Sequence, residues 1–251
     1  MKNLITLFLI TLSVFSYAQT NSNWEYYRTN RWEAVKGKQQ AFRDAAGKKT
    51  KMFNNSPETA MVTYQIMTGP DQGKFERVNV AKTLEQIYSE NTAEQKYWSE
   101  NVGKYVADME GSKVWWILKD WSSNWVDGRK PFNYIEVNTM TIRGGETNFR
   151  RVMQRYFEVL NENNSTRVTA VFKISSGDQL ATFRWCTFFD DPMKARGEWT
   201  NEEHTFEEVY NTKFGFNSYR TDMDILWGAT QMYGDYVETM KLVPEMSFMG
   251  N

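Results

Sequence analysis

The chain contains two copies of one sequence pattern, separated by about 107 residues. Residues 37–42 and residues 144–149 both begin with Gly and end with Phe. The apolar residues that follow recur at the spacing of one buried helix face, and the two sets keep an offset of 107 at every position. Two copies of one folding unit predict an internal pseudo-dimer, and ligand sites favour the seam between such units. The matched residues are Phe42, Ala45, Ala46, Met52 and Phe53 in the first copy and Phe149, Val152, Met153, Val159 and Leu160 in the second.

Each copy predicts the same order of elements: strand, helix, strand, hairpin turn, strand, helix and strand. In the first copy the hairpin turn lies at residues 69–73 and the closing strand at residues 113–121. In the second copy they lie at residues 176–179 and residues 236–243. This β-α-β-β-α-β order is the ferredoxin-like split motif. The predicted fold class is α+β, with two tandem ferredoxin-like βαββαβ repeats that form an intramolecular pseudo-dimeric α+β barrel.

The duplicated layout resembles the dimeric α+β barrel proteins, in particular the NIPSNAP and antibiotic-biosynthesis monooxygenase branches. The features that carry the resemblance are the early β-strand, the Gly and Phe that open the first helix, and the hairpin at residues 68–73. The sequence also looks like a group of secreted bacterial proteins with tandem units of this kind. The resemblance implies small, often apolar or aromatic ligands inside the barrel and sometimes oxygenation without a cofactor. Some barrels of this superfamily bind haem through one His.

The repeat also predicts the domain boundaries. Gly128 and Pro131 mark a connecting segment between the copies. Near residues 215–235 the second copy carries an insertion, which is either a packed extra helix or a lid. We divide the chain into a signal peptide (residues 1–18), a first ferredoxin-like repeat (19–121), a linker (122–131) and a second repeat (132–251).

Residues 1–18 have the three parts of a secretory signal peptide. Lys2 supplies the charged start, an apolar stretch follows, and Ser16 and Ala18 form a small-x-small cleavage site. The apolar stretch is too short to span a bilayer core, which argues against a membrane anchor. We expect cleavage near Ala18 and a secreted or periplasmic protein with no membrane span after signal removal.

The net charge excludes one class of partner. The chain has 30 Lys and Arg residues against 31 Asp and Glu residues, a net charge of −1, which becomes −2 when Lys2 leaves with the signal peptide. Because no basic excess exists to neutralise phosphates, we expect no nucleic-acid partner. Cys186 is the only cysteine, so an internal disulfide is excluded.

The residues most suited to metal or nucleophilic chemistry are few. His204 is the only histidine, so a Ser–His or Cys–His couple has a single candidate base and a multi-His metal site has almost no material. It follows a predicted helix cap, which suits an exposed position better than a haem ligand. Cys186 lies beside Trp185 and near Phe188 in a β-prone run, which favours a buried thiol over a nucleophile. We predict no metal and no cofactor.

Polar residues on strands that should be covered on both faces indicate a site. Strand alternation places Tyr134, Glu136 and Asn138 on one face, and the same rule turns Lys173 inward if the apolar face of its strand meets the helices. A buried charge requires a partner, water or a ligand; the alternative is a barrel mouth where these groups are hydrated. The predicted ligand-binding residues are Tyr27, Arg31, Gln65, Trp116, Tyr134, Glu136, Asn138, Lys173 and Arg184.

These observations favour an exported barrel that binds a small, partly apolar molecule at the seam between the repeats. The first alternative is a cofactor-independent oxygenase or isomerase in the same pocket, with Glu136 as the candidate base. The second is a structural or interaction module whose interior is fully packed. A cavity inside the barrel separates the first two hypotheses from the third, and a cavity carboxylate of raised pKa separates the enzyme from the binding protein.

Overall fold

The computed structural model describes residues 25–126, 130–163, 165–193, 199, 201–230 and 236–248. The predicted signal peptide lies outside these ranges, as does part of the predicted linker, including Gly128. None of the helices within them is long and apolar enough to cross a membrane.

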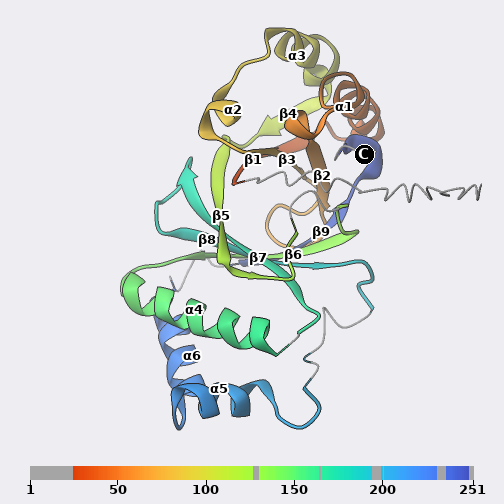
Figure 1. Ribbon diagram of the computed structural model, residues 1–251. Coiled ribbons are helices and arrows are strands. Elements are labelled where there is room, and N and C mark those ends of the chain that lie inside the picture. Colours follow the sequence, from red (N-terminus) through yellow and green to blue (C-terminus); the bar gives the residue numbers. More distant parts are fainter. Residues whose placement is uncertain are drawn as a thin grey trace, which may run out of the picture.

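The first half of the chain alternates strands and helices, and a short strand, β4, precedes its closing strand (Figure 1). Short 3₁₀ and π turns connect several elements. The elements are β1 (Tyr26–Ala34), α1 (Gln39–Phe53), β2 (Met61–Ile66), β3 (Phe75–Ala81), α2 (Leu84–Tyr88), α3 (Thr92–Tyr97), β4 (Val106–Met109) and β5 (Lys113–Ser123).

The second half repeats this order and has longer helices. Its last helix, α6, falls in the predicted insertion and packs against α4 and α5. The elements are β6 (Tyr134–Thr141), α4 (Glu146–Glu162), β7 (Val168–Ser176), β8 (Thr182–Phe189), α5 (Phe206–Phe214), α6 (Ser218–Ala229) and β9 (Tyr236–Leu242).

Eight strands form a closed antiparallel barrel in the order β1-β3-β2-β9-β6-β8-β7-β5, and β4 pairs with β1 outside this ring. Each half contributes four neighbouring strands. The halves join at two seams, β2 with β9 and β5 with β7. Moving four places around the ring takes each strand to its counterpart in the other repeat, so the halves are related by a pseudo-two-fold rotation. The predicted fold class is confirmed.

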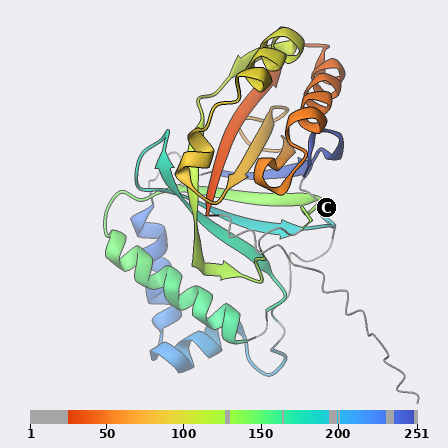
Figure 2. The ribbon, with the colours of Figure 1, turned by 45° about the horizontal axis from the view of Figure 1, so that its top comes forward.

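The helices of the two halves cover opposite sides of the barrel (Figures 1 and 2). In the first half, Phe42 of α1 packs on Phe75 of β3, with ring centroids 5.3 Å apart. In the second half, Phe149 of α4 packs on Phe183 of β8 at 4.9 Å. The same pair of aromatic residues therefore attaches the first helix to the outer face of the barrel in each repeat.

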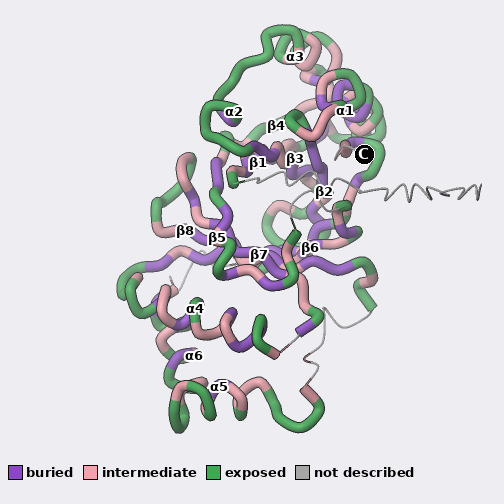
Figure 3. The backbone as a smooth tube through the Cα atoms, viewed as in Figure 1, coloured by how far each residue is buried: buried purple, intermediate pink, exposed green. Residues whose placement is uncertain are grey.

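The barrel strands carry most of the buried positions, whereas the helices expose their outer faces (Figure 3). A separate apolar cluster fills the barrel interior and draws residues from both halves. Tyr27 of β1 contacts Phe172 of β7 edge to face, with ring centroids 4.8 Å apart. This contact bridges the two halves around the seam formed by β5 and β7.

Candidate functional site

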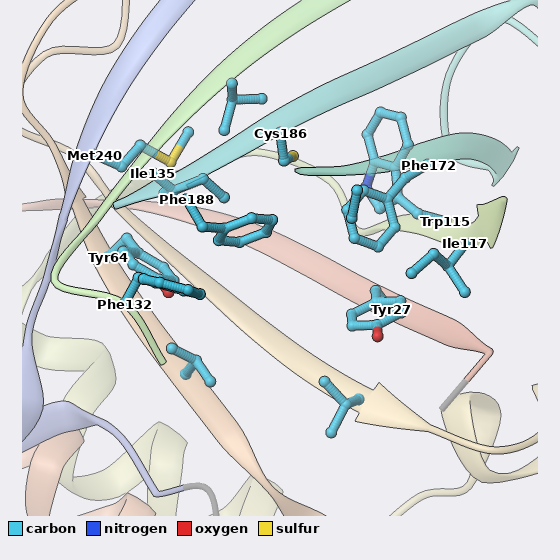
Figure 4. Close-up of a cluster of buried hydrophobic side chains, with 14 of the residues drawn as sticks. Tyr27, Tyr64, Trp115, Ile117, Phe132, Ile135, Phe172, Cys186, Phe188 and Met240 are labelled. Atoms are coloured by element: carbon cyan, nitrogen blue, oxygen red, sulfur yellow. The ribbon is translucent and has the colours of Figure 1, made fainter. Parts of the chain in front are cut away.

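The barrel encloses a cavity of about 100 Å³. Its walls are mainly apolar and aromatic and come from both repeats (Figure 4). Tyr27, Tyr64 and Trp115 belong to the first repeat, and Phe172 and Phe188 to the second. Because these side chains project inward from strands on both sides of the barrel, neither repeat alone forms the cavity.

The cavity reaches the surface at the segment that joins the two repeats. Val126 and Lys130 line it and are exposed to solvent. The Trp125 ring packs against the Phe188 ring at a tilt, with centroids 4.8 Å apart, and the Phe132 ring lies 5.7 Å from Phe188. The entrance is therefore framed by aromatic side chains, a lining suited to molecules with an apolar body.

One side of the cavity is polar. Glu76 of β3 and Arg184 of β8 lie on strands at opposite sides of the ring and meet across the interior. The Arg184 Nη1 and Nη2 atoms donate to the two carboxylate oxygens of Glu76 at 2.8 and 3.0 Å. The guanidinium carbon of Arg184 also lies 4.4 Å from the centre of the Trp115 ring. An apolar cavity thus ends at a buried, bidentate ion pair.

Arg31 extends this ion pair into a network. Its Nε donates to Glu76 at 2.8 Å, and its two Nη atoms donate to Glu238 at 3.0 and 2.5 Å. It also forms an ion pair with Asp71, which bonds Lys74 at 2.7 Å. The Arg31 side chain is only 4% exposed, and Glu238 is fully buried. One guanidinium therefore contacts three carboxylates, and the further positive charges of Arg184 and Lys74 complete the charge balance of the network.

The network sets the protonation of its members. Burial would raise the pKa of Glu76, but the charges and hydrogen bonds of Arg184 and Arg31 lower it to about 2. Burial would lower the pKa of Arg31, yet its carboxylate partners raise it above its ordinary value. Burial also raises the pKa of Glu238, and Arg31 only partly offsets that effect. Glu76, the carboxylate that lines the cavity, is therefore ionised and a weak base.

This pKa predicts an acid dependence of stability. The pKa of Glu76 falls from 4.5 to about 2 on folding, so the folded state binds fewer protons between these values. The resulting stabilisation, about 3 kcal/mol at ~1.4 kcal/mol per pKa unit, is complete above pH 4.5 and is lost as the pH falls toward 2. Urea unfolding from pH 6 to pH 2 measures it. The Glu76→Gln variant should lose this part of the slope; an unchanged slope would contradict the assignment.

Two further titratable groups of the cavity, Cys186 and Tyr64, hold their protons at physiological pH. Burial raises the pKa of the Cys186 thiol to about 12. It also raises the pKa of Tyr64 above its ordinary value. A thiol that holds its proton is a poor nucleophile and a poor metal ligand.

The structure turns three of the predicted site residues into the barrel. Tyr27 and Arg184 line the cavity, and Arg31 lies against Glu76 behind it. The inward direction predicted for these residues is confirmed. Their role in binding a ligand remains a prediction.

The predicted direction of Tyr134, Glu136 and Asn138 is wrong. The alternate residues Ile135 and Val137 line the cavity instead, and their side chains are buried. Strand alternation then places the three polar or aromatic residues on the outer face of β6. The physical reason is that an interior closed to water selects the apolar face of a strand, so Glu136 is not positioned as a base for the cavity.

The predicted placement of Gln65, Trp116 and Lys173 in the barrel interior is wrong for the same reason. Each lies one residue away from a side chain that does line the cavity: Tyr64, Trp115 and Phe172. The Lys173 Nζ lies 3.1 Å from Glu146 at the start of α4, and Trp116 is 41% exposed. These three residues therefore belong to the outside of the barrel.

Glu76 and Glu238 were missed as members of the site. The sequence contains a signal for Glu76: Phe75 and Phe183 are matched residues of the two copies, so Glu76 and Arg184 also occupy matched positions. Opposite charges at equivalent, inward-facing positions of two repeats indicate an ion pair between them. Glu238 has no such counterpart of opposite charge in the cavity, and its place at Arg31 follows only from the register of β9.

The residues present do not fit haem. His204 is exposed just before α5, where its backbone N–H bonds Asn201 and its carbonyl accepts from Trp199 at 2.7 Å. It does not line the cavity, whose volume is well below the roughly 300–1,000 Å³ of pockets for larger ligands. Within the described ranges, no three His, Cys, Asp or Glu side chains gather in a way that could hold a metal ion.

Comparison with known proteins supports the fold. Neither a protein-family model nor a curated sequence matches the chain. A candidate monooxygenase from Lactobacillus acidophilus NCFM matches with a TM-score of 0.52 at 7% identity, covering 87% of this chain and 94% of that one. A candidate monooxygenase from Fusobacterium nucleatum subsp. nucleatum gives 0.53 at 9% identity, covering 87% and 92%. A haem-binding protein from Thermus thermophilus gives 0.51 at 12% identity, covering 89% and 93%.

These neighbours and the closed eight-stranded ring agree with the resemblance drawn from the repeat. At such low identity they establish architecture alone. The chain has the dimeric α+β barrel fold, with both halves of the barrel supplied by one polypeptide.

Proposed function

We propose that this protein binds a small, mainly apolar molecule of about the size of one six-membered ring inside the barrel. The observation that carries the proposal is the cavity of about 100 Å³ between the repeats. For comparison, an engineered apolar cavity of about 150 Å³ in another protein binds benzene. Tyr27, Trp115, Phe172 and Phe188 would surround the ring, and the exposed end near Val126 would admit it.

The structural neighbours add support by analogy. Two of them are described as candidate monooxygenases and one as a haem-binding protein, so the fold is associated with small molecules in other chains. Because their identity to this chain is 12% or less, no residue role is transferred from them.

Binding without catalysis is favoured over cofactor-independent oxygenation. A general base works best when its pKa lies near the operating pH. Among the described residues that line the cavity, the one carboxylate is Glu76. Burial raises its pKa, but its two arginine partners outweigh that effect and lower the pKa to about 2. Glu136, the base suggested by the sequence, lies on the outer face of β6. The oxygenase alternative therefore rests on the neighbours and not on a positioned base.

Benzene and toluene, each with one six-membered ring, are suitable probes for this proposal. Benzene at a hundred times its Kd should stabilise the protein by about 2.7 kcal/mol, because it binds the folded state alone. The Val137→Phe variant should abolish this gain by filling the cavity, since Val137 lines it and is buried. The matched control is Val237→Phe, which makes the same change at a residue that is 50% exposed.

Thermal unfolding with and without probe, together with a binding isotherm, measures the effect. Binding that persists in Val137→Phe would place the probe elsewhere. A wild-type protein whose stability responds to neither probe at millimolar concentration would overturn the proposed function.

A further inference from the structure

Arg184, a residue that lines the cavity, carries a buried donor that the folded chain leaves unused. The Arg184 side chain is 5% exposed, and its two Nη atoms hold Glu76. Within the described residues, the Nε–H of Arg184 has no hydrogen-bond acceptor. Because the guanidinium is planar and rigid, the bidentate contact with Glu76 and the contact with the Trp115 ring fix the direction of this N–H. A donor left unpaired in this way is costly, so it requires an explanation.

A second polar atom lies beside it. Thr139 of β6 is directly opposite Arg184 of β8 in the antiparallel register, so both side chains lie on the inner face. Thr139 is 7% exposed, and its Oγ1 also lacks a partner within the described part of the chain. Arg184 lines the cavity, and Thr139 lies beside it on the inner face of the barrel without lining the cavity itself, so the two unsatisfied polar atoms are neighbours.

Other polar groups at this side are already satisfied. The Trp115 Nε1 donates to the Thr29 hydroxyl at 3.0 Å. The Glu76 carboxylate accepts from both Arg184 and Arg31. Unused hydrogen-bonding capacity is thus concentrated at Arg184 and Thr139, while Tyr64, Phe172 and Phe188 provide apolar walls.

The charges at this side select a neutral group. The three positive charges of Arg31, Arg184 and Lys74 balance the three negative charges of Glu76, Glu238 and Asp71. An additional carboxylate beside Arg184 would lie close to the Glu76 carboxylate and be repelled by it. An uncharged oxygen can accept from the Nε–H without that repulsion.

We propose that the ligand of this cavity is a small ring compound with one neutral carbonyl oxygen, which accepts a hydrogen bond from the Arg184 Nε–H, with the Thr139 hydroxyl as a second donor. This inference rests on the proposed binding function and names the ligand class for the same site. The ring occupies the apolar part of the cavity, and the oxygen points toward the ion pair.

Three probes of similar size test the assignment. Cyclohexanone carries the carbonyl, methylenecyclohexane replaces its oxygen by CH₂, and cyclohexanecarboxylate carries a negative charge. Their dissociation constants are measured by NMR titration of the full mature chain. Cyclohexanone should bind about ten-fold more tightly than methylenecyclohexane, because a hydrogen bond to a charged donor replaces an unpaired one.

Two variants separate this role from a merely structural one. Arg184→Lys keeps a cation for Glu76 but removes the Nε–H, and Thr139→Val removes the hydroxyl at nearly constant volume. The ten-fold preference, taken as the ratio of the two dissociation constants within each variant, should fall below about two-fold in Arg184→Lys and should weaken in Thr139→Val. If Arg184→Lys fails to fold, Thr139→Val still tests the preference.

The outcomes distinguish the two proposals. Equal binding of cyclohexanone and methylenecyclohexane by the wild-type protein would overturn the carbonyl assignment and leave the binding function standing. Tightest binding by cyclohexanecarboxylate would also overturn it, in favour of an anion site. Failure of all three probes to bind would count against the binding function itself.

Discussion

Replacing Arg31 with Met is expected to lower the free energy of unfolding by about 3–5 kcal/mol. The substitution leaves the buried carboxylates of Glu76 and Glu238 without the guanidinium that bonds both of them. Glu76 keeps Arg184 as a partner, whereas Glu238 loses the guanidinium that offsets its burial, and burial already raises the pKa of Glu238. Breaking a buried ion pair on one side is far more costly than never having formed it, since the remaining charge stays buried.

Urea denaturation followed by circular dichroism measures this loss. The matched control is Arg220→Met, which removes an ion pair with Glu207 at 3.0 Å whose arginine is 72% exposed. Its cost should not exceed about 1 kcal/mol, because solvent screens exposed pairs. Equal costs for the two variants would mean that the network does not stabilise the barrel.

Replacing Phe183 with Ala in the otherwise unchanged chain is expected to lower the free energy of unfolding by about 3–5 kcal/mol. Phe183 is fully buried on the outer face of β8 and lies 4.9 Å from Phe149 and 6.1 Å from Trp121 between ring centroids. Truncation would leave a cavity where α4 attaches to the barrel. The loss combines the transfer free energy of the ring with the cost of that cavity.

The matched control for this prediction is Phe216→Ala, because Phe216 is fully exposed. Its effect should stay within about 0.5 kcal/mol. The two variants differ in burial and not in chemistry, so denaturant midpoints compare them directly. A loss below about 1 kcal/mol for Phe183→Ala would show that α4 is not held through this ring.

The architecture was predictable because it depends on periodic patterns that occur twice. The helix faces that begin at Phe42 and Phe149 and the two hairpins recur at nearly constant offset, and the structure contains each of them. The helix caps do not follow from such patterns. Thr83 caps α2, Asn91 rather than the adjacent Thr92 caps α3, and Thr205 caps α5. Neighbouring polar residues compete for one capping position, and packing of the helix decides between them.

The direction of the strands was not predictable in the same way. Alternation divides β6 and β7 into two faces but does not say which face is inside. In this barrel both faces of β7 carry apolar residues, because Phe172 packs in the interior and Val171 packs beneath α4. Assigning the apolar face to the helices therefore inverted both strands and moved the predicted site by one residue.

The ion pair between Glu76 and Arg184 has a consequence for ancestry and assembly. Equivalent residues that touch each other must lie at the rotation axis relating the repeats. In a homodimer, a side chain at the axis meets its own copy, so either residue would place two like charges in contact. Joining two domains in one gene lets the axial positions diverge to opposite charge. A fused chain can therefore place opposite charges at the axis between its two repeats, whereas a symmetric dimer of identical chains cannot.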